Sequence, residues 1–135
     1  MSEGSSKTTA LLVMTIFLLV LVGQAAGKSG TLDGKIFSGV IGEKGQPAAG
    51  KEQLTFKDGR FRALSGDAYG FGSASYKTKI KGTAITFEAT TVSAKEGKIL
   101  WRGAVTGSKL QATASWSMPG HNHTHDYWVK ADLKK

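Results

Sequence analysis

Apolar and polar residues alternate along short segments of the chain after residue 28, and glycine-containing turns separate these segments. The alternation is clearest over 110–118, where leucine, alanine, tryptophan and methionine share one face and glutamine, threonine and serine share the other. A period of two predicts strands with one buried and one solvated face, and no stretch keeps the spacing of an amphipathic helix. We expect eight strands, at 32–41, 53–56, 60–64, 74–80, 84–92, 98–106, 110–118 and 127–133.

The connections between these strands are of two kinds. Tight turns with a glycine join alternate pairs of strands, at 57–59, 81–83 and 107–109. The other connections are mostly longer and rich in Gly, Pro, Ser or His, at 42–52, 65–73, 93–97 and 119–126. In a simple meander, alternate connections lie at opposite ends of the sheet. We therefore expect the long loops to gather at one end and the tight turns at the other.

Strands with one apolar face must hide their edges, and closure into a barrel does this completely. The sequence predicts an all-β fold, an eight-stranded antiparallel up-and-down meander barrel forming a single domain over 28–135, with a two-sheet β-sandwich as the alternative. In strand number and meander order, residues 32–133 resemble lipocalin-like (calycin-type) barrels and small exported bacterial β-barrel proteins. Lipocalin-like barrels usually carry Gly-x-Trp in the first strand, and here Gly34-Lys35-Ile36 has isoleucine at the tryptophan position.

Residues 1–27 have the organisation of a secretory signal peptide. Lys7 precedes the apolar segment 10–22, and small residues follow it. This segment is shorter than the about 20 apolar residues that a membrane-spanning helix needs, so a signal peptide is favoured over an uncleaved anchor. Cleavage after Ala25 or after Gly27 fits the small residues equally well. We expect an exported protein, located in the periplasm or outside the cell.

The net charge is +8, from 18 Lys and Arg against 10 Asp and Glu, and the chain has no cysteine. Its stability must therefore come from packing and strand pairing without disulfides. The basic residues are spread over predicted outward positions and turns, which favours a solvated surface. The alternative is an anionic partner such as an envelope polymer or a lipid surface. Nucleic acid is not expected as a partner, because the chain carries a predicted export signal and no nucleic-acid-binding motif.

All three histidines lie within one short segment, His121, His123 and His125, and Asp126 follows them. In an extended segment alternate side chains point the same way, so three imidazoles would share a face. Such a set is suited to Zn²⁺, Cu²⁺ or Ni²⁺, and the cofactor candidates are Zn²⁺ and Cu²⁺. The favoured interpretation is nevertheless an exposed polar loop that binds metal only opportunistically. A pH sensor is a third interpretation.

The segment 67–72 places Tyr69 and Phe71 among glycines in one of the long loops. The favoured interpretation is a hydrophobic plug, in which one or both rings fold over the barrel end. The alternative is the lip of a ligand site, since glycine allows close approach and aromatic rings supply apolar area.

Several small residues fall on the predicted inward faces, namely Ala63, Ala89, Gly103, Ala112, Ala114 and Ala131. The interior of an eight-stranded barrel is either just filled or holds one small ligand. Small inward residues favour a cavity for an apolar or aromatic ligand. A flattened barrel that packs them against Trp101, Trp116 and Phe87 accounts for them equally well.

Catalysis is not expected from this sequence. Cysteine nucleophiles and a Gly-x-Ser-x-Gly turn are absent, so only metal-assisted chemistry at 121–126 stays open, with Asp126 as the base. The leading hypothesis is an exported non-enzymatic barrel that binds a small apolar or amphipathic ligand at its long-loop end. Its expected ligand-binding residues are Tyr69, Phe71, Trp101 and Trp116. The alternatives are a metal-binding protein using His121, His123, His125 and Asp126, and a structural or interaction module of the cell envelope.

Overall fold

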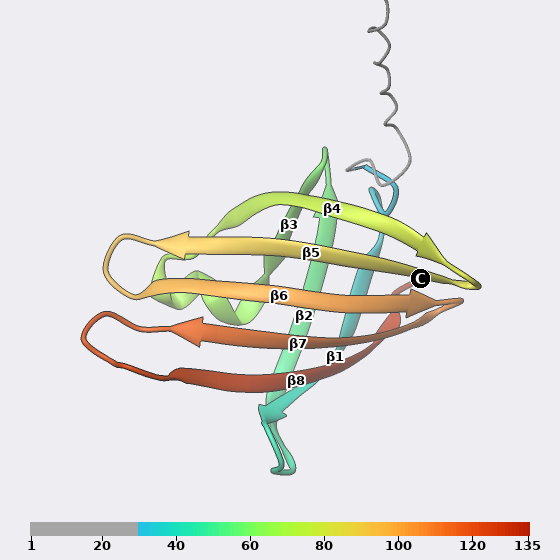
Figure 1. The fold of residues 1–135 in the computed structure, drawn as a ribbon. Helices are drawn as coiled ribbons and strands as arrows, with labels where there is room; N and C mark the ends of the chain where they lie inside the picture. Colours follow the sequence, from blue (N-terminus) through green and yellow to red (C-terminus); the bar gives the residue numbers. More distant parts are fainter. Residues whose placement is uncertain (1–29) are drawn as a thin grey trace, which may run out of the picture.

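The structure is a computed structural model that describes residues 30–135. Eight antiparallel strands form a closed barrel in which each strand pairs with the next and β8 pairs back with β1 (Figure 1). The strands are β1 (Ile36–Glu43), β2 (Ala48–Lys57), β3 (Arg60–Ala63), β4 (Ser73–Lys81), β5 (Ala84–Ser93), β6 (Gly97–Thr106), β7 (Lys109–Ser117) and β8 (Thr124–Leu133). The predicted all-β meander barrel is confirmed, and closure excludes the two-sheet sandwich. The predicted signal segment, 1–27, lies outside the described residues.

The chain enters the barrel through a turn rather than through a strand. The strand predicted at 32–41 begins only at Ile36, because Gly34 takes a φ of 89° and the Lys35 N–H donates to the Leu32 carbonyl. Leu32 itself is fully buried. Its backbone N–H donates to the Tyr76 hydroxyl over 3.0 Å. This turn therefore closes the barrel at the end that carries the β2–β3 hairpin.

Strand β2 is much longer than the predicted 53–56. Its first half, Ala-Ala-Gly-Lys, is exposed and has low strand propensity, so the sequence gives little sign of a strand there. Pairing with β1 holds it extended, with Lys51 opposite Val40 and Gly50 opposite Ile41. The connection predicted at 42–52 is consequently a short turn that ends where β2 begins at Ala48.

Aromatic rings fill the half of the barrel near the tight turns. The ring of Phe56 lies between 4.9 and 6.1 Å from those of Phe37, Phe61, Tyr76 and Phe87, centroid to centroid. All five side chains are buried. In this half the barrel interior is packed rather than hollow.

The small inward residues make room for these rings. A Cβ placed on Gly103 would lie 2.6 Å from Cε1 of Phe87 and 2.7 Å from the carbonyl oxygen of Gln111. The predicted inward alanines are all buried, namely Ala63, Ala89, Ala112, Ala114 and Ala131. Packing against aromatic rings thus explains the small residues in this half of the barrel. At the other end a pocket remains, as the cavity interpretation predicts.

The long connection between β3 and β4 contains the 3-10 helix η4 (Leu64–Tyr69), which lies beside the β5–β6 and β7–β8 connections on the left of Figure 1. The tight β4–β5 and β6–β7 turns lie on the opposite side. Over residues 30–135, no helix is long and apolar enough to cross a bilayer.

Candidate functional site

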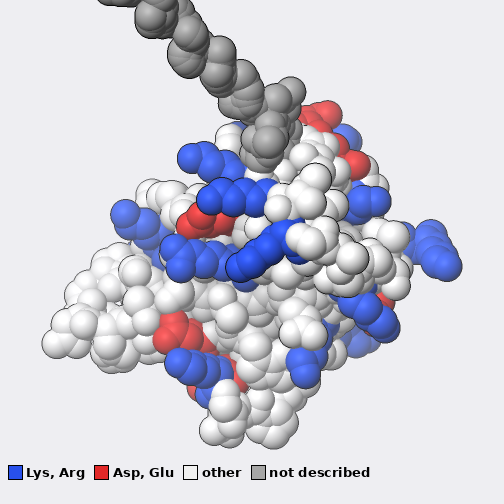
Figure 2. Space-filling model, turned by 45° about the vertical axis from the view of Figure 1, so that its right-hand side comes forward, with Lys and Arg blue, Asp and Glu red and all other residues white. Residues whose placement is uncertain are grey.

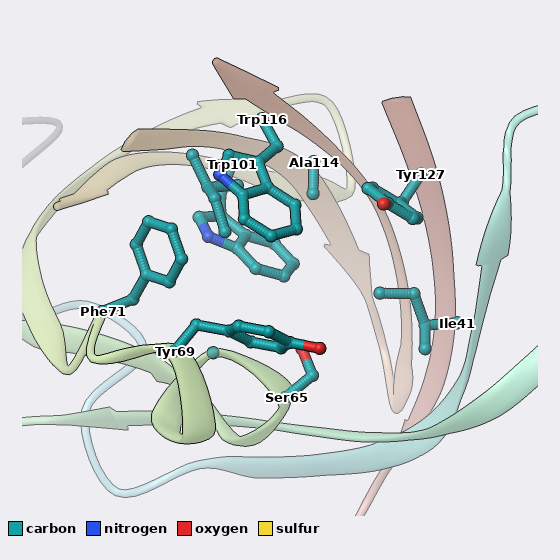
Figure 3. Close-up of a pocket in the computed structure, with 10 residues that line it drawn as sticks. Ile41, Ser65, Tyr69, Phe71, Trp101, Ala114, Trp116 and Tyr127 are labelled. Atoms are coloured by element: carbon teal, nitrogen blue, oxygen red, sulfur yellow. The ribbon is translucent and has the colours of Figure 1, made fainter. Parts of the chain in front are cut away.

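A pocket of about 200 Å³ opens at the barrel end that carries η4. Its walls come from η4 and the segment after it, and from strands β1, β6, β7 and β8 (Figure 3). The lining residues are Ile41, Ser65, Gly66, Tyr69, Phe71, Ile99, Trp101, Ala114, Trp116 and Tyr127. Segments far apart in the sequence thus converge on one predominantly apolar hollow.

The four predicted ligand-binding residues all line this pocket. Trp101 is buried in the barrel, whereas Trp116 is only half-buried at its mouth. Phe71 is 4% exposed and Tyr69 is 53% exposed, so the two rings of the 67–72 segment have different positions. Phe71 is part of the core, as the plug interpretation predicts, and Tyr69 forms a lip at the pocket.

Local backbone geometry sets the direction of these two rings. Gly70 has a φ of 83°, which favours glycine, and its N–H donates to the Asp67 carbonyl to end η4. The Phe71 N–H then donates to the carbonyl of Gly66, and a Cβ on Gly66 would lie 3.2 Å from Cβ of Phe71. The glycines therefore let the chain fold Phe71 inward directly below the helix.

An ion pair holds η4 against β3. Both Arg62 Nε and Nη2 donate to the Asp67 carboxylate, over 3.0 and 2.9 Å, and this contact raises the pKa of the guanidinium. On the other side, the Ser93 hydroxyl donates to the Tyr69 carbonyl over 2.7 Å. The lip of the pocket is thus anchored to β3 and β5.

Both indole N–H groups are used within the protein. Trp116 Nε1 donates to the Glu96 carbonyl over 2.7 Å, and Trp101 Nε1 donates to the Thr91 hydroxyl over 3.2 Å. These bonds fix the orientation of the rings. The tryptophans accordingly offer the pocket their apolar surfaces rather than a donor.

Besides Tyr69, two hydroxyl-bearing residues line the pocket, Ser65 and Tyr127, and the sequence did not single them out for the site. The Ser65 hydroxyl donates to Glu52, whose carboxyl group is buried among the inward residues of β2. The same carboxyl group accepts from the Ser65 N–H over 3.0 Å, which fixes the start of η4. A glutamate at an inward position of a predicted strand would have indicated a buried polar site. Residue 52 was instead predicted to lie in a loop, so Glu52 was not noticed.

Ile41 and Tyr127 also line the pocket, and the sequence did not assign them to the site. Tyr127 was predicted on the inward face of its strand, so the alternation placed it correctly without showing its role. Partial burial is the main cause that raises the pKa of its hydroxyl above the ordinary value, and the nearby Glu43 and Tyr69 add to this effect. Tyr127 therefore presents a neutral hydroxyl at the pocket at physiological pH.

The three histidines converge, although not as an extended segment. His121 and His123 lie in the bend before β8, and His125 is in β8 itself. One ligand nitrogen from each ring lies within 4.8 Å of the other two. His121 Nδ1 and His125 Nε2 are 3.1 Å apart. The predicted grouping of the three imidazoles is therefore present, but it is produced by a turn.

Asp126 does not join this group. Its Oδ1 accepts from the Ser115 hydroxyl over 2.6 Å and from the Thr124 hydroxyl over 3.1 Å. These two hydrogen bonds are the main reason that the pKa of Asp126 is lowered. Because neighbours on a strand point to opposite faces, Asp126 lies on the outward face while His125 lies on the inward one. The structure thus separates the fourth predicted metal ligand from the other three.

The positive charge is concentrated on parts of the surface. Figure 2 shows Lys and Arg side chains gathered across the upper part of one face, with few acidic groups among them. On β4, the exposed residues Lys77, Lys79 and Lys81 share the outward face. Arg102 differs, because it forms an exposed ion pair with Glu88 at 3.2 Å. Such a surface is available to an anionic partner but does not specify one.

Comparisons with protein families, with curated proteins and with solved structures gave no match to this chain.

Proposed function

We propose that this protein is a non-enzymatic binding protein that takes a small apolar or amphipathic molecule into the pocket beside η4. The observation that carries this proposal is the pocket wall, in which Tyr69, Phe71, Trp101 and Trp116 surround one hollow. Apolar concave sites with a few placed polar groups are the usual form of small-molecule sites. The closed eight-stranded meander supports a lipocalin-like binding barrel, and the predicted signal segment supports action outside the cytoplasm.

The size of the pocket limits the ligand. Its volume is about 200 Å³, whereas an apolar cavity of about 150 Å³ holds benzene. A flat molecule with one or two rings fits these limits, and a long acyl chain does not.

The polar atoms of the wall indicate what else the ligand carries. The Ser65 hydroxyl uses its proton on Glu52, so it can only accept a hydrogen bond from a ligand. The neutral Tyr127 hydroxyl can donate or accept. A ring bearing a single hydroxyl or N–H group, such as a phenol, naphthol or indole, matches this arrangement.

The lining residues also support a binding role rather than a catalytic one. Among the described residues that line the pocket, none has a carboxyl, imidazole or amino group. General acid–base catalysis at neutral pH usually depends on such groups.

The test is calorimetric titration of the protein with 2-naphthol. We expect one site with a dissociation constant of roughly 10–100 µM. Ala114→Leu adds a side chain within the pocket and should abolish binding, whereas Ala104→Leu, on the opposite face of the barrel wall, should not. Tyr69→Ala provides a second variant at an exposed position, should Ala114→Leu disturb folding. Equal binding by all these proteins would overturn the proposal.

A further inference from the structure

We propose that His121, His123 and His125 form a preorganised site for a divalent transition-metal ion, Zn²⁺ or Cu²⁺, at the rim of the pocket. The proposal does not depend on the ligand proposed above. It concerns the connection between β7 and β8, which the pocket wall does not include.

The spacing of the nitrogens matches metal coordination. Zn–N bonds are 2.0–2.1 Å long, so two nitrogens on a tetrahedral zinc ion are about 3.3 Å apart. His121 Nδ1 and His125 Nε2 are 3.1 Å apart and share a hydrogen bond, whose proton an incoming ion would displace. The His123 ligand atom is within 4.8 Å of both, so a small ring movement brings it into the same coordination sphere.

The three imidazole rings lie close together. The centroids of the three imidazoles are separated by 5.0 to 5.9 Å. Two of the histidines are exposed and one is half-buried, so an ion can reach them from solvent. Three neutral imidazoles leave one position of a tetrahedral ion for water, which is the ligand count of an open zinc site.

The base of the loop is fixed by contacts that do not involve the imidazoles. The His121 N–H donates to the Met118 carbonyl over 3.1 Å. A Cβ on Gly97 would lie 2.0 Å from the Ser117 carbonyl oxygen, so the end of β7 packs directly on the start of β6. Asp126 is bonded to Ser115 on the neighbouring strand. This framework distinguishes the loop from a flexible histidine-rich peptide.

The strand register places the site beside the pocket mouth. His125 is directly opposite Trp116 in the β7–β8 ladder, and residues opposite each other point to the same face. The next inward residue of β8 is Tyr127, which lines the pocket. A bound ion would therefore tie the β7–β8 connection together next to the mouth.

The experiment is titration of the untagged protein with Zn²⁺ and with Cu²⁺, compared with a synthetic peptide of residues 118–127. We expect one ion per chain, tighter binding of Cu²⁺ than of Zn²⁺, and at least tenfold tighter binding by the protein than by the peptide. His121→Asn, His123→Asn and His125→Asn should each lower the affinity at least tenfold. Co²⁺ bound to the protein should give the visible spectrum of a tetrahedral site.

Two controls make the result decisive. Ser117→Ala changes an exposed side chain at the base of the loop. Asp126→Asn removes the negative charge but keeps an Oδ1 that can accept from Ser115, so the framework remains. Each should change the affinity less than threefold. Thermal unfolding of every variant without metal should match that of the parent protein. Equal affinity of protein and peptide, or a loss in Asp126→Asn as large as in the histidine variants, would overturn the proposal. Loss of 2-naphthol binding alone would leave it standing.

Discussion

The ring of Tyr69 lies 5.6 Å from the ring of Trp116, centroid to centroid, with an angle of 59° between the planes. Tyr69 ends the helix η4, and Trp116 is near the end of β7. This contact joins a loop to the barrel wall and forms one side of the pocket mouth. Phe71 meets the same indole edge-on at 5.7 Å, from inside the core. Trp116 thus contacts both Tyr69, at the lip of the pocket, and Phe71, in the core beneath it.

Tyr69→Ala is expected to weaken 2-naphthol binding about fivefold to tenfold, because it removes one aromatic wall. The matched control is Leu64→Ala. Leu64 is in the same helix and is 56% exposed, close to the 53% of Tyr69, but it does not line the pocket. Calorimetric titration should give Leu64→Ala the affinity of the parent protein. Equal losses in both variants would mean that η4 acts only as a scaffold.

Phe71→Ala should instead reduce the free energy of unfolding, by about 3 kcal/mol, since it leaves a cavity in the core. Val92→Ala is the control, because Val92 is 60% exposed and its truncation should cost less than about 0.5 kcal/mol. Urea denaturation of both variants measures the difference. A Phe71→Ala protein as stable as the parent would contradict the assignment of this ring to the core.

Gly103→Ala should destabilise the barrel by about 1–3 kcal/mol. The added methyl group would meet both Phe87 and the backbone of Gln111, and the backbone oxygen cannot move aside cheaply. Gly50→Ala is the matched control, since the nearest atom there is 4.0 Å from the new Cβ. Thermal unfolding should show a lower midpoint for the first variant alone. Equal midpoints would show that the interior is looser than its packing indicates.

The strand alternation predicted most of this architecture. In β5 to β8 every second residue points inward, so the repeating pattern located both the strands and the small residues that face Phe87 and Trp101. The pattern failed where pairing or a turn overrode it. The residues after Pro47 are polar or small, and only their ladder with β1 makes them a strand. The strand predicted from residue 32 begins only at Ile36, because the turn at Gly34 precedes it.

The site was predictable only in part, for a physical reason. Aromatic residues in a glycine-rich loop indicated Tyr69 and Phe71, and aromatic residues on inward strand positions indicated Trp101 and Trp116. Ser65 was not identified, because its role depends on a hydrogen bond to Glu52, which is distant in sequence. The separation of Asp126 from the histidines likewise follows from the β7–β8 register.

The closed end of the barrel should lose stability in alkali. Burial is the main cause that raises the pKa of Tyr76 to about 12, and the hydrogen bond from its hydroxyl to Asp33 adds to it. The unfolded chain loses this proton near pH 10, so between pH 10 and 12 it binds fewer protons than the folded chain, and stability falls as the pH rises. The two-unit difference corresponds to about 3 kcal/mol across that range.

Tyr76→Phe should remove this part of the alkaline loss. At neutral pH it should cost about 1–2 kcal/mol, because the Leu32 N–H and the Asp33 carboxyl group lose their partner. Urea denaturation at pH 8, 10 and 11.5 measures both effects. Parallel stability curves for the two proteins over this range would refute the role assigned to the Tyr76 hydroxyl.

The central claim is that a small aromatic molecule enters the pocket, and nuclear Overhauser contacts between 2-naphthol and the protein test it most directly. The methyl groups of Ile41 and Ala114 lie on the pocket wall, so we predict contacts from the naphthol ring to both. The methyl group of Ala104 faces the outer surface and should give none. Contacts confined to outer-face residues such as Ala104, or the absence of any contact at millimolar 2-naphthol, would contradict the claim.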